Sequence, residues 1–346
     1  MFESREENKM TYDELLASAR ESIGDKCKAC PVCDGKACRN RVPGPGAKGL
    51  GLTAINNFEA WRNYKVNLDT LCANADIATS LELFGKTFKY PIFAGPVGAV
   101  NLHYGPKYTD VTYNDVLVSA CAEAGIAAFT GDGTDANVMV AATAAIKAQG
   151  GLGVPTVKPW NMPVVKEKLK MVKESGAFAC AMDVDAAGLP FLKGLEPPAG
   201  RKSVDELHEI IKEAGVPFIV KGIMTPNAAL KAMAAGASGI VVSNHGGRVQ
   251  DDTYPTAEVL GEIAAVVNGQ MKIFVDGGIR TGADVFKALA LGADAVLIAR
   301  PYVTAVYGGG AEGVKFYTEK IGEELRDTMM MCGADTLADI NEDKIF

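Results

Sequence analysis

Residues 272–299 read KIFVDGGIRTGADVFKALALGADAVLIA, which is the clearest strand–helix–strand pattern in the chain. It begins with an apolar, strand-like run, passes through a glycine-rich turn into residues with helical spacing at 283–291, and ends in a second apolar run. Two strands joined by a crossover helix lie parallel in a sheet. The stretch therefore predicts an α/β fold.

Similar units recur along the chain from residue 90 onward. Helical stretches at 164–174, 204–214, 226–235 and 283–291 separate strand-like runs at 90–94, 126–130, 152–157, 178–183, 216–221, 239–243, 272–276 and 295–299. Continuously apolar strands are typical of a parallel sheet covered by helices. Eight such runs favour a closed (β/α)8 TIM barrel over an open, doubly wound sheet.

The residues before the barrel predict a different kind of segment. Residues 11–23 have helical spacing, with Thr11 and Glu14 placed as a capping box. A cysteine-rich segment follows, and then a glycine- and proline-rich stretch that cannot form regular structure. We therefore expect residues 1–84 to form an N-terminal helical and cysteine-rich extension, and residues 85–346 to form the barrel.

Composition excludes several classes of protein. The chain has 346 residues, is 48% hydrophobic and carries a formal net charge of −7, so it can build a full core but offers no basic surface for nucleic acid. It has no run of about 18 apolar residues, which argues against a membrane span. The polar N-terminus, MFESREENKM, does not resemble a signal peptide, so we expect a cytoplasmic protein.

Polar residues gather where the predicted strands end. In a TIM barrel, catalytic residues cluster at these carboxyl ends, and phosphate groups bind near the loops after strands seven and eight. The residues that follow strands five to eight are Lys221, Ser243, His245, Arg248, Asp276, Gly277, Gly278, Arg280 and Arg300. This placement predicts an active site at the mouth of the barrel.

The chemistry of these residues suits a small acid and a phosphate. His245 can exchange a proton near neutral pH, and Arg248 can bind a carboxylate with two hydrogen bonds. The glycines after strand seven let backbone N–H groups approach a phosphate at a helix N-terminus. Alternative interpretations are a turn histidine, a tight turn with surface arginines, and a Lys221 side chain that reaches solvent. His103 is a candidate substrate contact, whereas His208 is expected on a helix surface.

The motifs V-K-G, S-N-H-G-G-R, D-G-G-I-R-T-G-A-D-V-F-K-A-L-A-L-G-A and A-R-P resemble those of the FMN-dependent α-hydroxy-acid oxidases and dehydrogenases. Glycolate oxidase and lactate oxidase are familiar members. Residues 216–340 match densely, residues 85–215 match in layout, and residues 1–60 hardly match. The resemblance implies oxidation of a 2-hydroxy acid to a 2-oxo acid, with O₂ or a redox partner as electron acceptor. It also implies a homo-oligomer, commonly a tetramer.

The resemblance also implies which residues hold FMN. The phosphate would lie at the loops after strands seven and eight, and Lys221 would stabilise the anionic reduced ring. The implied cofactor-binding residues are Ala94, Thr130, Lys221, Ser243, His245, Asp276, Gly277, Gly278, Arg280, Ala299 and Arg300.

A smaller set would carry out the reaction. By resemblance, His245 would accept a proton while hydrogen and electrons reach flavin N5, and Arg248 would bind the substrate carboxylate. An aspartate at the end of strand four would orient the histidine and raise its basicity. Asp183 is the better match and Asp185 the alternative. The implied catalytic residues are thus His245, Arg248, Asp183 and Lys221.

The sequence also departs from the family. Where the third strand usually carries Q-L-Y, this chain offers Gly153-Val154-Pro155, and Lys193 is a candidate replacement for a missing second substrate arginine. Two other functions therefore stay open. One is an FMN-dependent isomerase or an oxidoreductase of a larger α-hydroxy or α-amino carbonyl compound. The other is a flavin- or metal-binding sensor without turnover.

Four cysteines outside the resemblance form the pattern C-x₂-C-x₂-C-x₄-C: Cys27, Cys30, Cys33 and Cys38. Four thiols this close can surround one soft metal ion or cluster. Zinc would make the segment a structural clip, and an Fe–S cluster would indicate an electron-transferring dehydrogenase. An unliganded, cysteine-rich loop is the alternative.

Overall fold

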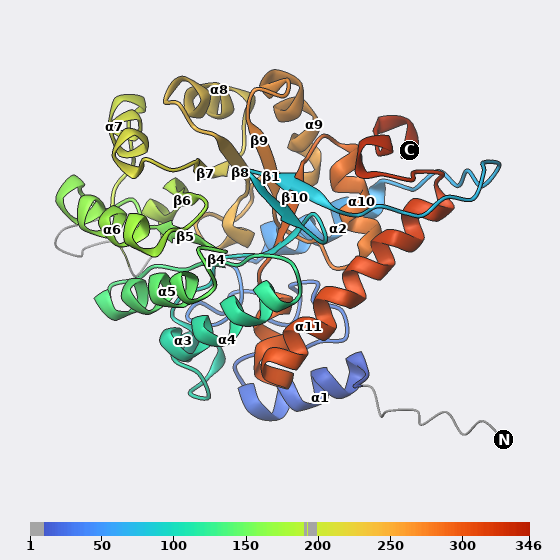
Figure 1. Ribbon diagram of the computed structural model, residues 1–346. Coiled ribbons are helices and arrows are strands. Elements are labelled where there is room, and N and C mark those ends of the chain that lie inside the picture. The colour runs from blue at the N-terminus through green and yellow to red at the C-terminus, as the bar shows by residue number, and fades with distance from the viewer. Residues whose placement is uncertain (1–9, 190–191, 193–198) are drawn as a thin grey trace.

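The protein is described by a computed structural model over residues 10–189, 192 and 199–346. Within this part of the chain, eight parallel strands follow one another in the order β3-β10-β9-β8-β7-β6-β5-β4 (Figure 1). They are β3 (Ile92–Ala94), β4 (Phe129–Thr130), β5 (Val154–Val157), β6 (Cys180–Asp183), β7 (Phe218–Ile223), β8 (Gly239–Val242), β9 (Lys272–Val275) and β10 (Ala295–Ile298). A bridge between Ala94 and Ala128 joins the two edge strands. The predicted (β/α)8 barrel is confirmed.

Helices surround this ring of strands (Figure 1). They are α3 (Val100–Tyr104), α4 (Asp110–Glu123), α5 (Ala136–Ala148), α6 (Met162–Ser175), α7 (Val204–Ala214), α8 (Pro226–Ala234), α9 (Thr256–Val267), α10 (Gly282–Ala290) and α11 (Arg300–Met331). Among the described helices, none combines the length and the apolar character that a membrane crossing needs.

Aromatic side chains fill the inside of the barrel. Phe274 packs edge-on against Phe93 and Phe129, with ring centroids 5.7 and 5.6 Å apart. A hairpin of β1 (Leu81–Leu83) and β2 (Lys86–Phe88) brings Phe88 to 4.8 Å from Phe93 and 5.5 Å from Phe178. Because Phe178 precedes β6, the hairpin lies at the amino ends of the strands. The carboxyl ends are left free to form a site.

The N-terminal residues pack closely against the barrel. The helix α1 (Tyr12–Ile23) has the predicted Thr11 capping box, and its Tyr12 stacks on Tyr317 of α11 at 6.1 Å. In the helix α2 (Leu52–Asn63), the indole N–H of Trp61 donates a hydrogen bond to the carbonyl of Gly277 at 2.7 Å. The extension therefore supports the loop after β9. The division of the chain at residue 85 stays a prediction.

Candidate active site

A cavity opens at the carboxyl ends of the strands and contains most of the residues that the sequence predicts. The predicted residues that line it are Asp183, Lys221, His245, Arg248, Asp276, Gly277, Gly278, Arg280, Ala299 and Arg300. Ala94, Thr130 and Ser243 are fully buried and are not among its lining residues. The structure thus brings together side chains from β6 to β10 and the turns that follow them.

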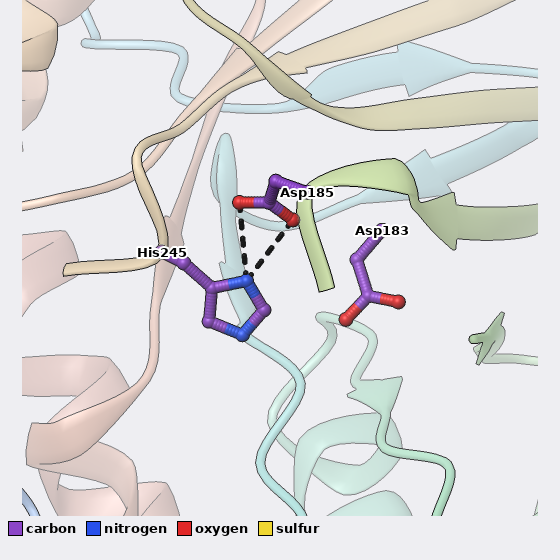
Figure 2. Close-up of side chains that lie close together, drawn as sticks. All are labelled: Asp183, Asp185 and His245. Atoms are coloured by element: carbon purple, nitrogen blue, oxygen red, sulfur yellow. Dashed lines mark hydrogen bonds and ion pairs between the residues drawn. The ribbon is translucent and has the colours of Figure 1, made fainter. Parts of the chain in front are cut away.

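His245 is held by Asp185, not by Asp183. The His245 Nδ1 atom lies 3.1 Å from each carboxylate oxygen of Asp185 (Figure 2). His245 has a left-handed backbone with φ of 56°, in the short 3₁₀ turn η3 (His245–Gly247). Burial and the Lys221 cation lower the pKa of His245, whereas Asp185 raises it. The balance favours the neutral imidazole near pH 7, which is the form that a general base requires.

The assignment of Asp183 as the partner of His245 was wrong. Asp183 ends β6, and one of its oxygens forms a buried ion pair with Lys158 Nζ. Asp185 lies two residues farther on, in the 3₁₀ turn η1 (Val184–Gly188), which carries its carboxylate to His245. Residues two apart on an extended chain point the same way, so sequence pattern could not separate the two aspartates.

The end of strand β5 contributes side chains that the sequence analysis did not identify. The strand continues to Val157, beyond the Gly153–Pro155 segment compared with Q-L-Y, and Thr156 and Lys158 line the cavity. The substrate side of the cavity is therefore not depleted of polar groups. It carries a buried cation next to Asp183. Lys193, the other suggested cation, lies outside the described residues.

A buried carboxylate fixes the loops after β4 and β5. Asp132 accepts hydrogen bonds from the Lys158 backbone N–H at 3.0 Å and the Trp160 indole N–H at 2.8 Å. Its other oxygen is 2.7 Å from Lys168 Nζ. Only 3% of Asp132 is exposed, so this charge depends on its partners. The network orients the backbone that carries Lys158 into the cavity.

Lys221 is a buried cation that faces the cavity. It is 2% exposed, which rules out a side chain that reaches solvent. Its Nζ donates to Ser243 Oγ at 2.9 Å and lies 3.4 Å from Asp276 Oδ2. Burial by itself lowers the pKa of Lys221, but the neighbouring carboxylates, Asp276 foremost, raise it above the usual value. The side chain therefore keeps its charge.

The loop after β9 has the glycine geometry of a phosphate site. Gly277 and Gly278 have φ of 94° and 82°. A Cβ on Gly278 would lie 2.0 Å from the carbonyl oxygen of Asn57, so only glycine fits there. Arg280 Nε, however, donates to the carbonyl of Cys33 at 2.8 Å, so this guanidinium contacts the cysteine segment as well as the cavity.

Arg248 lines the cavity and is held by the N-terminal loop. Its Nη1 donates to the carbonyls of Gly44 and Gly46 at 2.8 and 2.7 Å, and its Nη2 lies 3.1 Å from His103 Nε2. Burial first, and then the Arg248 charge, lowers the pKa of His103 to about 4, so this imidazole is neutral. His103 also lines the cavity, whereas His208 is exposed on α7 as predicted. The N-terminal loop thus positions Arg248.

The four N-terminal cysteines line a second, smaller cavity. In the part of the chain that the structure describes, no three of their sulfur atoms come within 4.8 Å of one another. The set that does meet this spacing consists of Asp183, Asp185 and His245. The close tetrahedral arrangement of four sulfur atoms that a bound zinc ion requires is therefore not preformed.

A (β/α)8 barrel whose mouth carries a neutral histidine, several cationic side chains and a phosphate-type glycine loop defines a class of cofactor-dependent barrel enzymes. The profile of the family described as FMN-dependent dehydrogenase matches residues 45–191 and 197–346. The chain belongs to this family.

Individual relatives agree with this assignment. L-lactate oxidase of Lactobacillus jensenii is 29% identical over 310 residues, which are 82% of this chain and 76% of that protein. 4-Hydroxymandelate oxidase of Amycolatopsis orientalis is 46% identical over 140 residues, 40% of this chain and only 38% of that protein. A solved structure of mandelate oxidase with (S)-2-phenylpropionate has a TM-score of 0.77 and 26% identity, covering 96% of this chain and 97% of its own.

The cavity fits the cofactor that the family name specifies. Four buried polar atoms of its lining residues have no hydrogen-bond partner: Thr156 Oγ1, Asp183 Oδ1, Asp276 Oδ1 and Arg300 Nη1. Buried polar atoms in proteins are nearly always paired, and an unpaired one costs about 1–3 kcal/mol. A bound molecule with hydroxyl, amide and phosphate groups would supply the partners. FMN has all three.

Proposed function

We propose that this protein is an FMN-dependent oxidoreductase that oxidises a 2-hydroxy acid to a 2-oxo acid. One observation carries the proposal: His245, oriented by Asp185, faces the same cavity as Lys221 and the glycine loop after β9. Removal of two protons and two electrons from a 2-hydroxy acid requires a base and a flavin site in one cavity. Family membership and the names of the relatives support the same reaction.

The residues divide into two functional groups. Gly277 and Gly278, with Arg280 and Arg300, would hold the FMN phosphate, because backbone N–H groups and guanidinium groups both bind anions. Lys221 would place its charge beside the flavin ring. When bound, FMN accepts the hydrogen and electrons that leave the substrate.

His245 would accept a proton from the substrate at Nε2, because its Nδ1 atom is held by Asp185. Arg248 would bind the carboxylate with the N–H groups that its backbone partners do not use. Lys158, which lines the same cavity, would contact the rest of the substrate. These roles distinguish the base from the groups that set specificity.

The test is anaerobic reduction of the bound flavin. Addition of L-lactate, glycolate or mandelate to the yellow protein should bleach the flavin absorbance with at least one acid. His245→Ala should keep the yellow colour, and its flavin should be bleached at least 100-fold more slowly. Purified protein that stays colourless after FMN is added would refute the proposal. Bleaching by none of the acids would favour the isomerase or the oxidation of a larger carbonyl compound.

We further propose that the protein is cytoplasmic, as its polar N-terminus indicates, and that it is a homo-oligomer, as the family resemblance implies. Light scattering of the purified protein checks the oligomeric state, and a mass equal to one chain would refute it.

A further inference from the structure

The cysteine segment forms a chamber beside the flavin cavity. Cys27, Cys30, Cys33 and Cys38 all line one small cavity, although the segment contains no helix or strand among its described residues. Apolar and aromatic groups from α1 and α11 complete the wall. Four thiols from one short loop that face the same space need an explanation beyond core packing, because all four are partly exposed, whereas free cysteines are usually buried.

Sulfur spacing separates the possible occupants. A single tetrahedral zinc at about 2.3 Å from each sulfur would hold all four within about 3.8 Å of one another. No three of these sulfurs meet even a 4.8 Å limit in the described chain. An iron–sulfur cluster distributes its cysteines over several irons, so its ligands surround a chamber at wider spacing.

The surroundings of the chamber suit an anionic cluster. Arg280 Nη2 lies 3.8 Å from Cys33 Sγ, and the Ala29 N–H donates to Cys27 Sγ at 3.5 Å. Arg300 lines the chamber and has a buried Nη1 atom without a partner. Cationic groups and N–H donors that point at sulfur stabilise clusters bound by thiolates.

The chamber and the flavin cavity share a wall. Pro45, Tyr104 and Arg300 line both. We propose that Cys27, Cys30, Cys33 and Cys38 bind an iron–sulfur cluster next to the flavin site. The cluster site itself does not depend on the proposed function, but its use as an electron relay does.

As a relay, the cluster would let the protein work as a dehydrogenase. Oxidation of one 2-hydroxy acid releases two electrons and two protons. The electrons would pass one at a time through the cluster to two molecules of an external one-electron carrier, and the protons would go to solvent. The carrier is reduced as the hydroxy acid is oxidised.

The test measures metal content in the full-length protein purified without oxygen. We expect two to four irons and an equal amount of acid-labile sulfide per chain, and an electron paramagnetic resonance signal after reduction with dithionite. Cys30→Ser should lose most of the iron and this signal. Cys72→Ser is the matched control, since Cys72 is an exposed thiol outside the chamber, and it should keep both.

The opposing outcomes are distinct. About one zinc per chain, no iron after reconstitution with iron and sulfide, or equal iron in the two serine variants would each overturn the cluster. Flavin content and bleaching are measured in the same samples. A protein that holds iron but no flavin would refute the proposed function and leave the cluster proposal standing. A yellow, iron-free protein whose flavin is bleached would refute the cluster and leave the proposed function standing.

Discussion

Replacement of Asp185 by asparagine tests the arrangement of the base. Both carboxylate oxygens lie 3.1 Å from His245 Nδ1, and asparagine keeps the shape and one acceptor while it removes the charge. A hydrogen bond to a charged group contributes about 1.5–3 kcal/mol. If that stabilisation is needed as the imidazole gains its proton, kcat/KM should fall by about 10- to 150-fold.

The same variant has a predicted pH dependence. Under the proposed role of His245 as the base, activity requires its neutral form, so kcat/KM should fall as the pH drops through the pKa of this residue. Burial and Lys221 lower that pKa, and Asp185 raises it. Removal of the carboxylate therefore lowers the pKa further, and the acid limb of the profile should move to lower pH. The measurement is kcat/KM from about pH 4 to 9, with thermal unfolding and flavin content as checks on folding.

Asp183→Asn is the comparison variant. Asp183 pairs with Lys158, so its effect on the acid limb should be smaller. A limb that stays in place or moves upward in Asp185→Asn, or a kcat/KM within twofold of the parent, would refute the role of Asp185. A larger shift in Asp183→Asn would return the role to that residue.

Two further predictions concern the cofactor and stability. Thr156→Val removes a buried hydroxyl without a partner, so the FMN dissociation constant should rise about 5- to 10-fold. The apoprotein should unfold at an unchanged urea concentration, and a loss of apoprotein stability would contradict this prediction. Asp132→Ala leaves Lys168 buried without its partner, so urea unfolding should show a loss of about 3–5 kcal/mol, and a loss under 1 kcal/mol would refute the structural role.

Local pattern was sufficient for the barrel and for most of one wall of the cavity. Lys221, His245 and the glycine loop follow strands whose apolar runs are visible in the sequence, and strand ends in a barrel meet at one rim. The wall from β5 was missed because the comparison with Q-L-Y stopped at Pro155, although the predicted run at 152–157 ends at the same residue as β5. Pro155 lies inside it, and a proline usually argues against a central strand.

The order of strands and helices, and the residue types at each strand end, could be predicted from the sequence because both follow from local spacing. The partners of these residues became known only from the tertiary structure. In the tertiary structure, His245 contacts Asp185 and Lys158 pairs with Asp183. Arg280 lies between the cysteine segment and the flavin cavity. Those contacts join residues far apart in the chain, and they depend on backbone direction after each strand, which sequence spacing does not specify.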